Sequence, residues 1–119
     1  MNRQEIFDTV ARHLLTQKVE SRTNNYGCSY RGECGTKCAV GILIPDEMYR
    51  PSMEGKMVGV VLQKSPELLP YLCADDIPVS GAICDLKALQ TIHDEFRPSQ
   101  WETELRKHAE QNGLEWNQP

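Results

Sequence analysis

The chain has 119 residues and a formal net charge of −4, with 39% apolar and 25% charged residues. This length predicts one domain with its own core, and the acidic balance argues against a general role in binding nucleic acid. No apolar run approaches the about 20 residues that a membrane helix needs. The N-terminus lacks the pattern of a signal peptide, so we expect a protein of the cytoplasm without a membrane partner.

The chain begins with an amphipathic helix over residues 3–17, in which apolar side chains recur at helical spacing. Residues 20–27 are polar without a period and predict a loop. Residues 26–38 then predict a short β-hairpin. Its turn, residues 32–35, contains two glycines that can adopt positive φ angles.

The next segment is apolar and too short for periodicity to decide its structure. Residues 38–44 fit a buried strand or a short helix. We favour the helix because Thr36 can cap it and Pro45 ends it. Residues 45–49 predict one further helical turn, whereas residues 56–63 fit a strand and a short helix equally.

Helices fill the second half of the predicted chain. Ser65 and the following Pro66 indicate the start of a short helix, and Ser80 is expected to cap a longer one that ends near Phe96.

The last predicted helix has the best-defined ends. Ser99 and Glu102 match a capping box, and Gly113 predicts a Schellman ending. Residues 115–119 are expected to form a loose tail. The pattern as a whole predicts an α+β fold, a mainly helical single domain with a small β-hairpin.

Cysteines make residues 28–55 chemically dense. Cys28, Cys34 and Cys38 are spaced C-x5-C-x3-C. A zinc ion bound by them would need a further ligand from Cys73, Cys84 or His93. Zinc sites usually contain tighter cysteine pairs. We therefore favour reduced thiols that are buried or lie in turns, with zinc as the alternative and no cofactor otherwise expected.

A cysteine nucleophile is a second hypothesis. Cys38 would lie in the first turn of the predicted helix, where the helix dipole favours a thiolate, and His93 could serve as its base. Adjacent helical residues point about 100° apart, so Asp94 is not expected to orient His93. We favour His93 as a hydrogen-bonded histidine at the edge of the core.

Anion binding is a third hypothesis. The guanidinium of Arg31 and the ammonium of Lys37 flank a glycine-rich turn and could bind a phosphate or carboxylate. Tyr26 and Tyr30 add aromatic rings for stacking near these cations.

Two carboxylates complete this predicted ligand-binding set. Asp46 and Glu54 are expected to order the cations. The alternative is a structural ion pair of Arg31 with Glu33, Asp46 or Glu54, which would tie the hairpin to the helices.

Adaptable side chains also cluster in this part of the chain. Met48, Tyr49, Met53 and Met57 could form a surface for a protein partner or could fill the core.

One motif runs through most of the chain. Its residues are Tyr30-Arg31-Gly32, Lys37-Cys38-Ala39-Val40-Gly41, Leu43-Ile44-Pro45-Asp46, Tyr49, Met53-Glu54-Gly55, Gln4-Glu5-Ile6-Phe7, Leu89-Gln90, Ile92-His93-Asp94 and Trp101. In this motif the chain resembles small uncharacterised proteins of bacteriophages, prophages and some bacteria. The resemblance covers most of the chain and implies phage or mobile-element biology. Cys34 lies outside the motif.

From these observations we expect a binding protein and not an enzyme. The hypothesis is a counter-defence or host-takeover factor that sequesters an anionic, nucleotide-like ligand through Tyr30, Arg31 and Lys37. The alternatives are an inhibitor that binds a host protein and a hydrolase or transferase that depends on Cys38. A homodimer is an arrangement that the sequence allows but does not specify.

Overall fold

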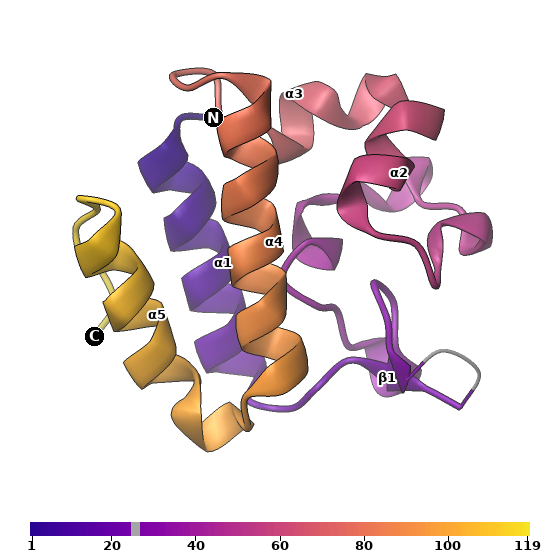
Figure 1. Ribbon diagram of the computed structural model, residues 1–119. Helices are drawn as coiled ribbons and strands as arrows, with labels where there is room; N and C mark the ends of the chain where they lie inside the picture. Colours follow the sequence, from indigo (N-terminus) through magenta and orange to yellow (C-terminus); the bar gives the residue numbers. More distant parts are fainter. Residues whose placement is uncertain (25–26) are drawn as a thin grey trace.

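The fold is mainly helical with a small β element, as predicted (Figure 1). The structure is a computed structural model that describes residues 1–24 and 27–119. Three long helices lie side by side, and two short ones pack beside the first turns of α4. In chain order they are α1 (Arg3–Gln17), α2 (Val58–Lys64), α3 (Leu69–Leu72), α4 (Val79–Glu95) and α5 (Trp101–Gln111).

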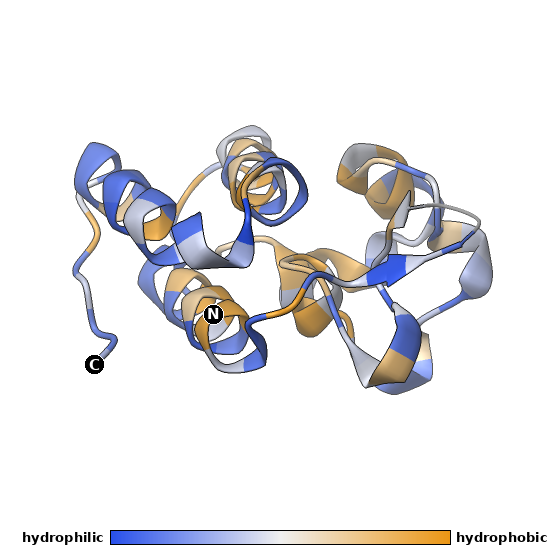
Figure 2. Cartoon of the chain, turned by 90° about the horizontal axis from the view of Figure 1, so that it is seen from below, coloured by the Kyte–Doolittle hydropathy of each residue, from blue (hydrophilic) through white to orange (hydrophobic). Residues whose placement is uncertain are grey.

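The core lies between the apolar faces of α1, α4 and α5 and continues into buried apolar residues of the segments 38–62 and 68–74 (Figure 2). Helix α1 begins with a capping box, in which Asn2 and Glu5 bind each other's backbone N–H groups. Its buried face is Ile6, Phe7, Val10, Ala11 and Leu14, which is the predicted stripe. Among the described residues, no helix is long and apolar enough to cross a membrane.

In the second half of the chain, a proline and not a side-chain cap marks the start of the helices after residues 65 and 78. Helix α4 begins at Val79 directly after Pro78, so Ser80 is not its N-cap. Ser65 makes no side-chain capping bond either, although Pro66 occupies the first turn as predicted. Proline at these positions fixes φ near the helical value, which defines the start without a cap.

The start of α5 also differs from prediction. The capping bond runs from the backbone N–H of Arg97 to the side chain of Gln100, 3.0 Å away, within the 3-10 turn Pro98–Gln100. Ser99 and Glu102 do not form the predicted box. The C-terminal end is as predicted, because Gly113 has a φ of 66° and the Leu114 N–H binds the Ala109 carbonyl.

Residues 115–119, the expected loose tail, run along α1. The backbone N–H of Glu115 donates to Gln4 at 2.9 Å, and the Asn117 amide donates to Asp8 at 3.1 Å. Trp116 packs edge-on against Phe7. The tail therefore contributes to the surface beside α1.

Residues 38–44 are helical and not extended, but only as the 3-10 turn Gly41–Leu43. Similar turns follow at Asp46–Met48 and Pro51–Met53. Residues 56–63, the second ambiguous segment, are mostly part of helix α2 and form no strand. Of the predicted methionine and tyrosine surface, Met53 is buried, Met48 and Tyr49 pack partly buried on the core, and Met57 alone is 65% exposed.

The β element differs in position from the predicted hairpin. Strand β1 (Arg22–Thr23) pairs antiparallel with β2 (Gly27–Cys28), although residues 20–27 were predicted as a loop. The predicted hairpin is reduced to a single antiparallel bridge between Arg31 and Lys37. In its turn, Cys34 as well as Gly35 adopts a positive φ.

Candidate functional site

A buried carboxylate organises the centre of the predicted site. Glu54 is 8% exposed and accepts the backbone N–H groups of Tyr30 at 2.9 Å and Arg31 at 3.0 Å. The hydroxyl of Tyr49 also donates to it, at 2.6 Å. Glu54 therefore replaces a neighbouring strand as the hydrogen-bond partner of this backbone, and its oxygens are occupied within the chain.

The two predicted cations share one carboxylate. Asp46 accepts from Arg31 at 2.5 Å and from Lys37 at 3.2 Å, and these two hydrogen bonds lower the pKa of Asp46. The Arg31 guanidinium also donates to the Ile44 carbonyl at 2.6 Å and lies 5.0 Å from the centre of the Tyr49 ring. The structural ion pair is thus present, and Asp46 is the acid that forms it.

The structure brings Tyr30, Arg31, Lys37, Asp46 and Glu54 together as predicted, but gives each an internal partner. The Tyr30 hydroxyl donates to the Lys56 carbonyl at 2.5 Å. Tyr26, the second predicted stacking ring, lies outside the described residues.

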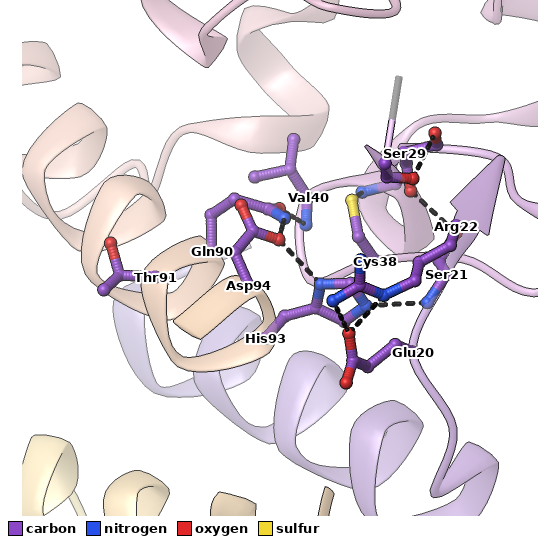
Figure 3. Close-up of polar contacts among 12 residues, drawn as sticks. Glu20, Ser21, Arg22, Ser29, Cys38, Val40, Gln90, Thr91, His93 and Asp94 are labelled. Carbon is purple, nitrogen blue, oxygen red and sulfur yellow. Dashed lines mark hydrogen bonds and ion pairs between the residues drawn. The ribbon is translucent and has the colours of Figure 1, made fainter. Parts of the chain in front are cut away.

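A second polar cluster fixes the loops to α4 (Figure 3). Asp94 Oδ1 lies 2.7 Å from His93 Nδ1 and accepts from the Gln90 amide, also at 2.7 Å. Gln90 in turn accepts the N–H of Val40 at 3.1 Å. The expectation that Asp94 cannot orient His93 is wrong. The 100° angle separates the two Cβ directions, whereas Nδ1 is the ring nitrogen nearer the backbone and the carboxylate can turn toward it.

The protonation state of His93 follows from its partners. The Ser21 backbone N–H donates to Nε2 at 2.9 Å, so Nε2 carries no proton. The proton is then on Nδ1, which donates to Asp94. With both nitrogens bonded and the side chain fully buried, His93 is the hydrogen-bonded core histidine that the sequence favoured.

The donor atoms of Cys28, His93 and Asp94 all lie within 4.8 Å of one another. A metal bound at Nδ1 would move its proton to Nε2, against the Ser21 N–H donor, so this nitrogen is not prepared for a cation. Of the cysteines in the zinc hypothesis, Cys34 is exposed and Cys38 is buried, and both lie outside this group. Zinc bound by Cys28, Cys34 and Cys38 stays a prediction.

The surroundings of Cys38 favour a thiol. Burial raises the pKa of Cys38 to about 12, although the Gly41 N–H points at its sulfur from 3.3 Å. The expected thiolate is thus opposed by desolvation, and the nitrogens of His93 are both engaged elsewhere. This geometry gives the nucleophile hypothesis no support.

A groove of about 640 Å³ lies beside α1, and we call it the α1 groove. Helix α1 forms one side of it, and residues 34–36 with Val19 and Ile42 form the other. The residues that α1 contributes are Thr9, Arg12, His13, Thr16 and Gln17.

Backbone contacts hold the two sides of the groove together. The Gln17 amide accepts the Lys37 N–H and donates to the Lys37 carbonyl, both at 3.0 Å, in the manner of a paired strand. His13 Nε2 lies 2.7 Å from the same carbonyl and therefore carries the proton. Burial lowers the pKa of His13, so the ring is neutral near pH 7.

Arg12 is the one permanently charged side chain among the described residues that line the α1 groove. Arg12 is exposed and makes no hydrogen bond or ion pair with any described residue, and no carboxylate is among the residues that line the groove. In the sequence, Arg12 shares the polar face of the first helix with Arg3, Gln4 and Asp8. No local signal distinguishes Arg12 from these residues.

Comparisons with protein-family models, with curated proteins and with solved structures gave no match.

Proposed function

We propose that the protein binds a small anionic ligand in the α1 groove. The observation that carries this proposal is the exposed, unpaired Arg12 in a groove without a carboxylate. A guanidinium is a planar, permanently charged donor that suits phosphate and carboxylate groups. In a chain of net charge −4, such a local cation favours a small anion over a long nucleic acid.

The predicted cations take a different role in this proposal. Arg31 and Lys37 are already paired with Asp46, so a ligand would have to displace an internal carboxylate to reach them. Through its backbone, Lys37 instead links the wall formed by residues 34–36 to His13 and Gln17. The cluster around Glu54 and Asp46 thus supports the wall of the groove.

The biological role that we propose is sequestration. The resemblance to phage and prophage proteins suggests a factor that removes a host nucleotide-like anion, such as an immune signal. Binding alone is sufficient for this role, which agrees with a buried Cys38 whose thiol is held protonated.

Calorimetric titration with pyrophosphate, AMP and ATP tests the proposal, with Arg12→Ala as the critical variant. Lys87→Ala is the matched control, because Lys87 is an exposed cation on a long helix and does not line the groove. We expect Arg12→Ala to weaken binding at least 10-fold, about 1.4 kcal/mol, and Lys87→Ala to bind normally. Equal affinities of the two variants would contradict the site.

The same mixtures distinguish binding from catalysis. We expect mass spectrometry to recover each bound nucleotide unchanged after prolonged incubation with the protein. A product that still forms in Arg12→Ala but not in Cys38→Ala would overturn sequestration in favour of the hydrolase alternative.

A further inference from the structure

Arg12 and Thr16 form an exposed ridge on α1, with the α1 groove on one side and a second hollow on the other. The second hollow has a volume of about 490 Å³ and is lined by Leu15, Lys18, Glu102 and residues 117–119, together with Arg12 and Thr16. Arg12 and Thr16 also line the α1 groove. The two hollows therefore meet at this pair of residues.

Helix geometry explains why they meet there. Successive residues rotate about 100° around a helix, so His13 and Gln17 project to one side of the ridge and Leu15 to the other. Arg12 and Thr16 lie between these directions. A group that binds the Arg12 guanidinium is thus adjacent to both hollows.

The charges around the ridge favour an anion at its centre. Neither Arg12 nor the Lys18 ammonium is paired with a described residue. Glu102 is the only acidic side chain among the described residues that line the two hollows, and it already pairs with Arg106 at 3.2 Å. Asp8, one turn before Arg12 on α1, accepts from Gln4 at 2.9 Å and from Asn117 at 3.1 Å. Away from the ridge, apolar side chains contribute to each hollow, Val19 and Ile42 in the first and Leu15 and Pro119 in the second.

We infer that the ligand is bipartite, with an anionic linkage at Arg12 and an uncharged ring system in each hollow. Dinucleotides have this chemistry, because one phosphodiester joins two bases. The inference rests on the proposed function and specifies its ligand class. A mononucleotide would fill one hollow only and forgo the contacts of the other.

The C-terminal tail forms one wall of the second hollow, so a truncation can open it. Asn117 and Gln118 hold the tail against α1 through Asp8, at 3.1 Å from its carboxylate and 3.5 Å from its carbonyl. Removing residues 117–119 deletes one wall of the second hollow. Trp116 remains, and so does its packing on Phe7 and Arg106.

The test compares two ligands that each carry one phosphodiester charge, cyclic AMP with one base and the linear dinucleotide ApA with two. Cyclic GMP and GpG form the corresponding guanine pair. We expect one of the dinucleotides to bind at least 10-fold more tightly than its cyclic mononucleotide. Truncation after Trp116 should remove this difference and leave cyclic mononucleotide binding unchanged, with a thermal melt close to that of the full chain.

The outcomes separate the inference from the proposed function. Equal affinities within each pair, lost together in Arg12→Ala, would leave the anion site standing and overturn the bipartite ligand. A dinucleotide preference that survives the truncation would also overturn it. If none of the four ligands binds the full chain, the bipartite ligand is wrong, and the titrations with pyrophosphate, AMP and ATP decide whether the anion site stands.

Discussion

The helical layer and the loop segment, residues 20–24 and 27–57, share one apolar core but satisfy their backbone hydrogen bonds differently. Helices α1, α4 and α5 pack through apolar faces, and their own backbones satisfy their hydrogen bonds. The loop segment has one two-residue strand pair, one isolated bridge and several single helical turns. Side chains bind much of its remaining backbone, and among them are Gln17, Glu54, Gln90 and His93.

Three of these side chains, Gln17, Gln90 and His93, belong to helices. The helical layer therefore supplies the hydrogen-bond partners that a sheet would supply elsewhere. Polar residues that look like ordinary helix surface are then essential to the loops and to the wall of the α1 groove. The comparison predicts that single polar or glycine changes in the loop segment are more destabilising than similar changes on exposed surfaces.

Glu54→Ala should give the largest effect. It leaves two buried backbone N–H groups and the Tyr49 hydroxyl without their acceptor, so we expect the free energy of unfolding to fall by about 4 kcal/mol. Glu54→Gln should lose less, because one amide oxygen remains while the amide nitrogen opposes a donor. Denaturant unfolding measures both. Glu47→Ala, an exposed acid of the same segment, is the control, and a loss as large as that of Glu54→Ala would contradict this role.

Gly41→Ala tests the close approach of the 3-10 turn to the Tyr30 backbone. A Cβ at position 41 would lie 2.1 Å from the Tyr30 carbonyl oxygen, and neither backbone can move freely, so we expect a loss of about 3 kcal/mol. Gly59→Ala in α2 meets nothing within 4 Å and should gain about 0.5 kcal/mol from helix propensity. Equal stabilities of the two variants would show that the turn does not press on Tyr30.

His93→Phe separates the hydrogen bonds of His93 from its packing. The ring that stacks on Trp101 at 5.4 Å is retained, but the Ser21 N–H loses its acceptor and Asp94 loses a donor. We expect a loss of about 2 kcal/mol, with faster hydrogen exchange at the Ser21 amide. Thr91→Ala on the exposed side of α4 is the control and should change neither. If the Ser21 amide exchanged its hydrogen as slowly in His93→Phe as in the unchanged protein, His93 would not be what holds this loop.

Periodicity predicted the helical layer because its packing follows local spacing. The stripe of α1 and the glycine ending of α5 follow directly from residue order. The predicted cap of α5 was wrong because two capping patterns overlap in the sequence, Arg97 with Gln100 and Ser99 with Glu102. The 3-10 turn Pro98–Gln100 forms the first of them. Such errors move a boundary by a residue or two and leave the fold unchanged.

For the loop segment, the sequence indicated which residues gather but not which contacts they make. The central motif correctly grouped Arg31, Lys37, Asp46 and Glu54, but their roles depend on partners far apart in sequence, such as Glu54 with Tyr30. The contribution of Arg12 arises when residues 34–36 fold against α1, which no local pattern encodes. Sequence therefore indicated where chemistry gathers, and tertiary contacts decided which cation remains unpaired.

The smallest predicted effect is a pH dependence that arises mainly in the helical layer. Burial lowers the pKa of His108, which stacks on Phe7 at 5.7 Å, and also lowers that of His13. The unfolded chain, with histidines near their ordinary pKa of about 6.5, then binds protons before the folded chain does. Stability is thus fully present above that pH and is lost as the pH falls toward 5.

His108→Phe keeps a ring against Phe7 and removes the titrating group, so it should flatten this loss between pH 7 and 5 by a few degrees in Tm. Asp85 and Arg3 face His108 with opposite charges and remain in the variant. Exposed Asp46 does not interfere, because its pKa is lowered and its contribution is lost only at more acidic pH. His13→Gln in the same background should remove most of the remaining slope. A slope that persists in the double variant would show that groups other than these two histidines cause the acid sensitivity.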